Sequence, residues 1–259
     1  MSGIKYWHAS WDSAVLDWFE KDIGVGFRSN GINLKSNIDP GEGYLTGPVF
    51  GYQTDDGTWS ISLALMLLSS FSQDWGGQAG SMELNTDVDT DRRDIDLAAS
   101  YSLAGFRKSL SIFKYTKLFV GYKYQQVDYD LSLSYDTLMG QRQFDYKLNA
   151  EVHMGTIGAG LAYPINDKFA IGLQAGVGLA LIELEMEEPD GSVFDVSPSA
   201  SFAYNGELTA TYTPIQNLIL QLGYRAQLWY LEARSPTRWE QTVSEDWTYG
   251  PTFTVVYAF

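Results

Sequence analysis

The chain contains no cysteine, only two histidines, and 17 Lys and Arg against 32 Asp and Glu. Without cysteine there is neither a disulfide framework nor thiolate chemistry. The formal net charge of −15 argues against a nucleic-acid partner, because contact with phosphates requires a basic surface. The excess of acidic residues is suited to binding cations or a basic partner, or it serves only to keep exposed segments soluble.

Long apolar runs are also missing. The longest aliphatic run, Leu63 to Leu68, has six residues, whereas a membrane helix needs about 18. The amino terminus reads MSGIKYW and lacks the charged and apolar regions of a secretion signal. We expect Met1 to be a start residue on a mature chain whose signal has been removed. With no GxGxxG or Walker sequence and no Cys/His cluster, no cofactor is expected.

Aromatic residues, by contrast, are abundant, since 17 Tyr, 13 Phe and 8 Trp make up 15% of the chain. The C-terminal segment WTYGPTFTVVYAF places aromatic and aliphatic side chains on one face of a strand, and mostly small or polar ones on the other. A transmembrane β-barrel needs such a face because its outside contacts lipid. The mean hydropathy of −0.17 agrees with this, because alternating strands average close to zero.

The same period-two alternation recurs along the chain and predicts about ten strands, within a range of about 8–12. Two weaker strands, near Ile4 to Ser13 and Tyr44 to Gln53, precede the clear ones. Short turns alternate with long connections at about 14–43, 73–92, 134–143, 187–196 and 235–246, as in outer-membrane barrels. We predict an all-β fold: one antiparallel transmembrane β-barrel domain over residues 1–259, with short periplasmic turns, long extracellular loops and both termini periplasmic.

By this pattern, and by its C-terminal Tyr-Ala-Phe, the whole chain resembles the bacterial outer-membrane β-barrel proteins. The resemblance is one of architecture and identifies no subfamily. It implies a place among the lipids of the outer membrane of a diderm bacterium. It also implies that the barrel-assembly machinery reads the final strand, with Tyr257 and Phe259 as the signal. A soluble β-sandwich or ligand-binding barrel also alternates, but its exterior would carry more charge.

The alternation reverses after Tyr124 and near Gly155. Either a β-bulge or the point at which a strand leaves the bilayer would cause such a reversal.

The predicted lumen receives polar side chains of both charge signs. They are Asp94, Asp96, Lys123, Gln125, Lys147, Glu151, His153, Glu207, Gln221, Arg225 and Gln227. In a barrel of about ten strands these groups either pair across the lumen and close it, or line a narrow path for small polar solutes. We therefore expect a non-enzymatic barrel, either a narrow channel or a structural protein.

Acidic residues gather in the long connections. Asp87, Asp89 and Asp91 begin like a calcium-binding loop, and they form a weak candidate metal site. However, Arg92 stands where an EF-hand loop needs Gly, and Ala98 where it needs Glu, so a solvated acidic loop is the alternative. Such loops, with a second acidic cluster from Glu183 to Asp190, could bind cations or a basic partner. A surface-loop binding or adhesion protein is therefore the alternative function.

His8 and Ser10 are two residues apart and so share one face of a strand. Outer-membrane phospholipase A and the lipid A deacylases use such a pair, with Ser as nucleophile and His as its base. Here Trp11-Asp12 follows in place of Asn-Gly, and the pair is expected on a lumenal face near the periplasmic end. A lipid hydrolase is thus the second alternative. The ten-stranded omptin proteases need Asp pairs and an Asp–His dyad at the outer rim, where neither His8 nor His153 is predicted.

Overall fold

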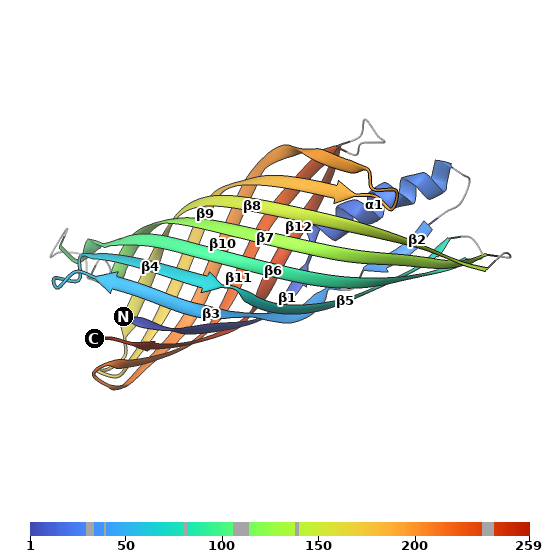
Figure 1. Ribbon diagram of the computed structural model, residues 1–259. Coiled ribbons are helices and arrows are strands. Elements are labelled where there is room, and N and C mark those ends of the chain that lie inside the picture. Colours follow the sequence, from blue (N-terminus) through green and yellow to red (C-terminus); the bar gives the residue numbers. More distant parts are fainter. Residues whose placement is uncertain (30–33, 39, 80–81, 106–113, 138–139, 235–240) are drawn as a thin grey trace.

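The computed structural model describes the whole chain except residues 30–33, 39, 80–81, 106–113, 138–139 and 235–240. Long strands run side by side, both termini lie at one end, and the helix lies toward the other end (Figure 1). In chain order the elements are β1 (Ser2–Asp12), α1 (Ala14–Ser29), β2 (Leu34–Ile38), β3 (Gly41–Gln53), β4 (Trp59–Met66), β5 (Leu68–Ala79), β6 (Met82–Ser102), η1 (Leu103–Gly105), β7 (Thr116–Thr137), β8 (Gly140–Pro164), β9 (Phe169–Glu187), β10 (Val193–Ile215), β11 (Leu218–Arg234) and β12 (Gln241–Tyr257).

Antiparallel pairing closes the sheet into a barrel. β1 pairs with β12 on one side and with β3 on the other. β4 and β5 are two segments of one barrel strand, because both pair with β3 and with β6. β2 and β3 likewise follow one another along β5. The result is a closed barrel of ten strands, and the predicted all-β barrel is confirmed.

The outer surface is apolar over the part of the barrel nearest the termini. On β7, for example, Leu118, Val120 and Tyr122 are 47%, 58% and 44% exposed on the outside. On β12 this belt extends from Tyr257 to Trp247, and Glu245 beyond it is exposed and polar. A soluble protein would bury side chains of this kind, whereas a membrane barrel places them in hydrocarbon.

Beyond the belt, the polarity of the two faces reverses. After Tyr124, the outer face of β7 becomes polar at Asp128 and Asp130, while the inner face becomes apolar. Val127, Tyr129, Leu131 and Leu133 are at most 4% exposed. The register of β7 with β8 nevertheless runs without a shift from Thr116↔Leu161 to Thr137↔Gly140. The reversal therefore marks where the strand leaves the bilayer and is not a β-bulge.

The long connections at the end away from the termini are largely ordered structure. β7 and β8 continue as a paired hairpin to Thr137↔Gly140, and β5 and β6 pair up to Ala79↔Met82. Strand therefore covers most of 73–92 and 134–143, and the first long connection contains α1, which the alternation did not predict. The short connections at the other end include the turn in which Gly57 has a φ of 69°, a conformation that favours glycine.

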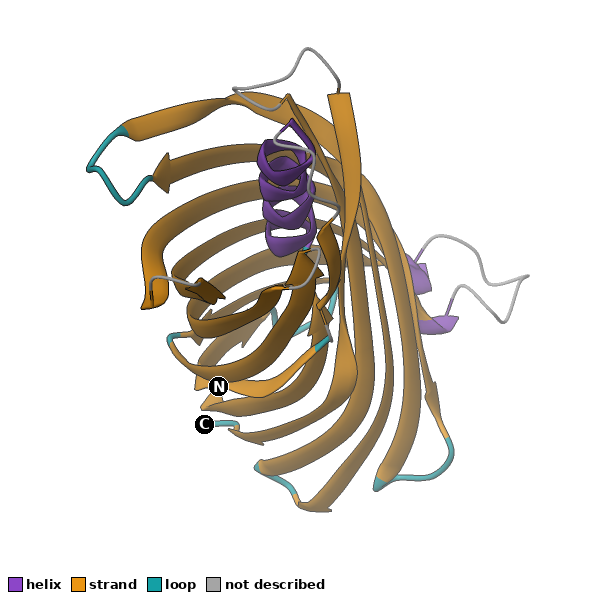
Figure 2. Cartoon of the chain, turned by 90° about the vertical axis from the view of Figure 1, so that its right-hand side faces the viewer, coloured by secondary structure: helices purple, strands orange, loops and turns teal. Residues whose placement is uncertain are grey.

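Helix α1 lies within the curve of the strands, inside the barrel end opposite the termini (Figure 2). The Ser13 hydroxyl caps its first turn by accepting a hydrogen bond from the Leu16 N–H at 3.4 Å. The first turn also carries the acidic residue Asp17. A hydroxyl cap and a negative charge both stabilise the start of a helix. Val15, Leu16, Trp18 and Phe19 are each 1% exposed. None of the described helices has the length and hydrophobicity to cross a membrane.

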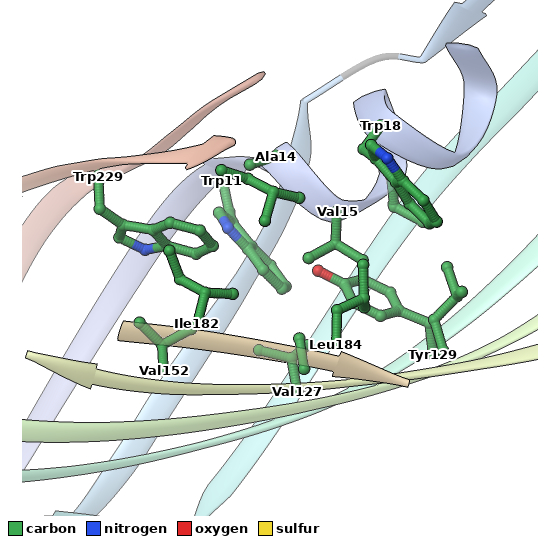
Figure 3. Close-up of a cluster of buried hydrophobic side chains, with 14 of the residues drawn as sticks. Trp11, Ala14, Val15, Trp18, Val127, Tyr129, Val152, Ile182, Leu184 and Trp229 are labelled. Atoms are coloured by element: carbon green, nitrogen blue, oxygen red, sulfur yellow. The ribbon is translucent and has the colours of Figure 1, made fainter. Parts of the chain in front are cut away.

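We call the part of the barrel beyond the apolar belt the extension; on β7 it begins after Tyr124. The buried side of α1 completes a hydrophobic core inside this extension. Trp11, Val15, Trp18 and Tyr129 lie in one cluster with apolar side chains from the opposite strands (Figure 3). Those strand residues include Val127, Val152, Ile182, Leu184 and Trp229. Burial of each large apolar side chain contributes about 1.5–3 kcal/mol. This part of the molecule therefore has the cross-section of a soluble protein, apolar inside and polar outside.

Candidate functional site

The interior of the barrel is divided into three layers, which can be followed along the inner face of β7. Tyr129 and Val127 belong to the apolar core beside α1. Lys123 and Gln125 are buried polar residues in the next layer. Phe119, nearest the termini, lines a cavity. The middle layer decides whether the lumen is open.

Arg92 lies at the centre of this charged layer and is 0% exposed. Its guanidinium donates to both carboxylate oxygens of Asp94, from Nε at 3.0 Å and from Nη2 at 3.1 Å. It also donates to Gln125 Oε1 at 3.1 Å and to Thr248 Oγ1 at 2.9 Å. A buried guanidinium is tolerated only when it is paired and hydrogen-bonded in this way.

Three further cations surround the same layer. Lys123 Nζ lies 2.5 Å from Asp94 Oδ2 and 3.6 Å from Asp96 Oδ1. Arg225 donates to Asp96 Oδ2 at 2.7 Å. Lys5 and Glu207 form an ion pair at 3.3 Å between Nζ and Oε1. Each of these cations therefore has an acidic partner inside the lumen.

The indole of Trp7 fills the space between these cations. Trp7 is 0% exposed, and its ring centroid lies 5.0 Å from the Arg225 guanidinium, 5.7 Å from Lys123 Nζ and 5.9 Å from the Arg92 guanidinium. Cations within about 6 Å of an indole face are attracted to its negative π surface. Ion pairs and cation–π contacts therefore hold these side chains together across the lumen at this height.

Asp246 connects the charged layer to α1. It lies on the helix side of Trp247, just beyond the apolar belt, and is 0% exposed. It accepts hydrogen bonds from the Trp11 indole N–H at 2.9 Å and from the Ala14 backbone N–H. Burial raises the pKa of Asp246 to about 6, against the opposing effect of Arg92 and of these two hydrogen bonds. The carboxyl group thus anchors the first turn of the helix to the last strand.

Most of the predicted lumenal residues lie on the inner face. Asp94, Lys123, Gln125 and Gln227 are buried, and Asp96, Glu207, Gln221 and Arg225 line the cavity below them.

The placement predicted for Lys147, Glu151 and His153 is wrong, because these residues lie on the outer face of β8. Their side chains are 67%, 39% and 38% exposed. Met154, one residue after His153, faces inward opposite Lys123 and is 2% exposed. The prediction assumes that apolar side chains face outward along the whole strand. This holds within the bilayer, but beyond its boundary the apolar side chains face inward.

His153 belongs to the aromatic border of the apolar belt. Its Nδ1 lies 2.7 Å from the Tyr122 hydroxyl, and its ring lies 5.1 Å from that of Tyr124. Glu151 Oε2 is 4.0 Å from its Nε2. Amphipathic rings of this kind are enriched where a barrel crosses from hydrocarbon to headgroups.

His8 and Ser10 also face outward, which corrects the expected lumenal placement. Trp7, Ala9 and Trp11 occupy the inner face of β1 and are each 0% exposed. Ser10 pairs with Tyr249 of β12 and with Glu42 of β3. The pair is thus at the border of the belt remote from the termini, and not near the terminal end. No hydrogen bond joins the side chains of His8, Ser10 and Glu42, all of which are described.

The candidate metal ligands Asp87, Asp89 and Asp91 lie in β6, exposed on its outer face. A strand spreads alternate side chains along its length, unlike a calcium loop, which wraps them around an ion. In the described parts of the chain, no group of three or more His, Cys, Asp or Glu could hold a metal ion. The loop interpretation of these aspartates is therefore wrong.

The sequence pattern does not identify Arg92, Trp7, Trp11 and Asp246 as residues packed inside the barrel. It predicts Arg92 and Asp246 at the ends of long connections, where a charge needs no partner. One signal for helix α1, which acts as a plug in this end of the barrel, was present in the sequence. Ser13 precedes the apolar residues Val15, Leu16 and Phe19, which lie at helical spacing.

No family model matches the chain, and no curated protein matches it. Among solved structures, it is similar to the outer-membrane protease OmpT from Escherichia coli, with a TM-score of 0.65 and 14% identity over 100% of this chain and 96% of OmpT. The translocator domain of the autotransporter NalP from Neisseria meningitidis has a TM-score of 0.46 and 9% identity, over 100% of this chain and 87% of that domain. The toluene transporter TodX from Pseudomonas putida has a TM-score of 0.31 and 11% identity, over 100% and 88%.

The similarity to OmpT shows the fold, which is that of the bacterial outer-membrane β-barrels. At 14% identity it shows the fold alone, and the function has to be argued from this chain's own residues.

Proposed function

We propose that the protein is a non-enzymatic barrel of the bacterial outer membrane with a closed lumen, and that it binds a cationic partner through the outer surface of its extracellular extension. The strands that leave the bilayer carry this surface, and the termini are periplasmic. The final strand, with Tyr257 and Phe259 on the outside at 50% and 89% exposure, is the segment that the assembly machinery would read.

The observation that carries the proposal is that acid faces acid across neighbouring strands. Asp89 is directly opposite Asp130, Asp91 opposite Asp128, and Glu151 opposite Glu183. The outward-facing carboxylates beyond the belt include Asp87, Asp89, Asp91, Asp128, Asp130, Asp145, Glu151, Glu183, Glu185, Glu187, Asp195, Glu232 and Glu245. Like charges directly opposite each other destabilise a sheet, and a bound polycation would relieve this repulsion.

The closed lumen favours this function over transport. A channel for small polar solutes needs a continuous path, whereas Trp7 and the paired charges occupy the lumen and α1 fills the end beyond them. An Asp–His dyad of the omptin kind would require a histidine at the outer rim of the barrel, with its side chain on the inner face. His8 and His153, the only histidines of the chain, both face outward.

Binding is tested with a tetralysine peptide and the protein in a zwitterionic detergent. The variant Asp89→Asn/Asp128→Asn/Asp130→Asn should weaken binding, and the weakening should be largest at low salt because exposed charges are screened by ions. The matched control Asp55→Asn/Asp56→Asn removes acid from the turn at the terminal end and should bind as the wild type does. Equal affinity of all three proteins would refute the proposed surface.

Closure and orientation are tested separately. In planar bilayers we expect no discrete conductance steps, and steps at any voltage would restore the channel hypothesis. A peptide tag in the turn between Glu187 and Val193 should be labelled on intact cells. A tag in the turn from Thr54 to Gly57 should be labelled only after permeabilisation, and the reverse result would invert the proposed topology.

A lipid hydrolase is the second candidate, because His8 and Ser10 face the lipid at the border of the belt with Glu42 across from Ser10. Ser10 would attack an ester carbonyl as His8 accepts its proton, and the lysophospholipid alcohol would leave with that proton as the C–O bond breaks. Water would then hydrolyse the acyl-Ser10 ester, which releases the fatty acid and restores the serine. Their side chains would first have to move into contact. Fatty-acid release from phospholipid vesicles, abolished by Ser10→Ala but not by Ser70→Ala, would establish this activity. Release that persists in Ser10→Ala would eliminate it.

A further inference from the structure

A cavity of about 460 Å³ lies in the lumen between the charged layer and the end of the barrel that carries the termini. Small-molecule sites generally have volumes of about 300–1,000 Å³. Trp7, Lys123 and Arg225 close the inner end of this space. The binding surface proposed above makes no use of it, because that surface lies outside the barrel and beyond the membrane.

The wall of the cavity combines apolar side chains with a set of uncharged polar ones. Gln174, Asn205 and Gln221 come from the neighbouring strands β9, β10 and β11. These three amides have no hydrogen-bond partner among the described residues. Further hydroxyl groups come from Ser62 and Thr156. Amide and hydroxyl groups both donate and accept hydrogen bonds, so the wall matches a solute that does the same.

Phe119 adds an aromatic surface to this wall. A Cβ atom on Gly158 would lie 2.4 Å from Phe119 Cζ, and one on Gly176 would lie 2.9 Å from it. The ring therefore packs directly over two glycines of the barrel wall, and Phe119 lines the cavity from there. The face of an aromatic ring is electron-rich, and it attracts the C–H groups on the flat side of a sugar ring.

Two acceptors at the inner end make no hydrogen bond, although Lys123 Nζ lies 3.6 Å from one of them, Asp96 Oδ1. Gln227 is 2% exposed and lines the cavity, and neither its Oε1 nor Asp96 Oδ1 has a hydrogen-bond partner. A buried acceptor without a donor costs about 1–3 kcal/mol, and solute hydroxyl groups would remove this cost. The cations Lys5 and Arg225 are already paired with carboxylates, so the inner end does not require a charged solute.

We propose that this cavity binds a small, neutral, hydroxyl-rich solute of the size of a mono- or disaccharide, which enters from the end that carries the termini. Phe119 provides the stacking surface, the amides of β9 to β11 bind the ring hydroxyls, and Gln227 accepts from the innermost hydroxyl. Lys117 also lines the cavity and has no acidic partner among the described residues. An anionic solute is therefore the alternative that the test has to exclude.

The test uses the full chain folded in an amine-oxide detergent, which has no sugar headgroup. Saturation-transfer NMR compares sucrose and glucose with the diamine putrescine and the trianion citrate. We expect transfer to the sugars, strongest at the ring C–H protons, and none to the ions. Absence of transfer to both sugars, or stronger transfer to putrescine or citrate, overturns the proposal.

Two variants connect the signal to the cavity. Phe119→Leu keeps the wall apolar and should weaken sugar binding about two- to tenfold, the value of an aromatic contact. Gln221→Ala should weaken it as well, whereas the control Gln126→Ala, on the outer face of β7, should bind as the wild type does. Heat-modifiable mobility on gels verifies that each variant is folded. Sugar binding that is unchanged in folded Phe119→Leu and Gln221→Ala places the signal elsewhere and refutes the site.

Discussion

The indole N–H of Trp11 donates a 2.9 Å hydrogen bond to the carboxylate of Asp246, two residues that are 235 positions apart in the chain. The bond joins the first strand to the last, just where β1 ends and α1 begins. Asp246 also accepts from the Ala14 N–H. One buried carboxyl group therefore ties the closure of the barrel to the position of its plug.

Replacement of this carboxyl by an amide should change how stability depends on pH. Burial raises the folded-state pKa of Asp246 from 3.8 to about 6, so the folded state binds the proton more tightly than the unfolded state. This group's contribution is therefore most favourable below about pH 4, and is lost as the pH rises through about 6. Asp246→Asn should unfold at a higher temperature than the wild type at pH 7.5. The difference should vanish near pH 4, as measured by heat-modifiable gel mobility.

A constant difference between the two proteins at all pH values would contradict this assignment. The exposed Asp190, in the turn after β9, provides the matched control, because Asp190→Asn should leave the unfolding temperature almost unchanged at neutral pH.

Removal of Arg92 alone should lower the free energy of unfolding more than removal of both Arg92 and Asp94. Arg92→Met leaves Asp94 buried with only Lys123 as its ion-pair partner, and the loss of one member of a buried ion pair costs about 3–5 kcal/mol. The double variant Arg92→Met/Asp94→Leu leaves less uncompensated charge and should recover part of that loss. Urea unfolding of the folded variants in detergent measures both. A double variant less stable than Arg92→Met would show that the pair itself supplies the stability.

Truncation of the helix plug should loosen the extension but not open a pore. Trp18 is 1% exposed, and Trp18→Ala should cost about 3–5 kcal/mol because it leaves a cavity. Lys21→Ala, on the exposed side of the same helix, should change stability by less than about 0.5 kcal/mol. Planar-bilayer recordings of Trp18→Ala should stay silent, because the charged layer around Trp7 remains. Conductance in this variant would show that α1 alone closes the barrel.

The height at which the strands leave the bilayer can be mapped with arginine on the outer face of β7. Val120→Arg places a charge in the apolar belt and should cost about 2–4 kcal/mol if it lies near the midplane. Ser132→Arg, on the same face beyond the belt, should cost almost nothing. Yields of assembled, heat-modifiable barrel report the difference. Equal yields of the two variants would mean that the belt does not contact lipid.

The local alternation of the sequence was sufficient to predict the barrel and its approximate strand number, because a strand exposes one face to lipid whatever its partners are. It also placed Asp94, Lys123 and Arg225 inside, since charges avoid the hydrocarbon. The same rule failed at Glu151 and His153, which lie on β8 near the boundary of the bilayer. Within the membrane the outer face of each strand is apolar, whereas beyond the membrane the inner face is apolar.

Only the tertiary structure decided where that reversal occurs, that Arg92 pairs with Asp94 inside the barrel, and that residues 14–29 fold into the lumen. Period-two alternation has the same repeat on both sides of the bilayer boundary, so it does not show whether a given face contacts lipid, water or the barrel interior. The environment of each face depends on the height of every strand relative to its neighbours. This height is set by pairings such as Ser2↔Tyr257, between residues at opposite ends of the chain.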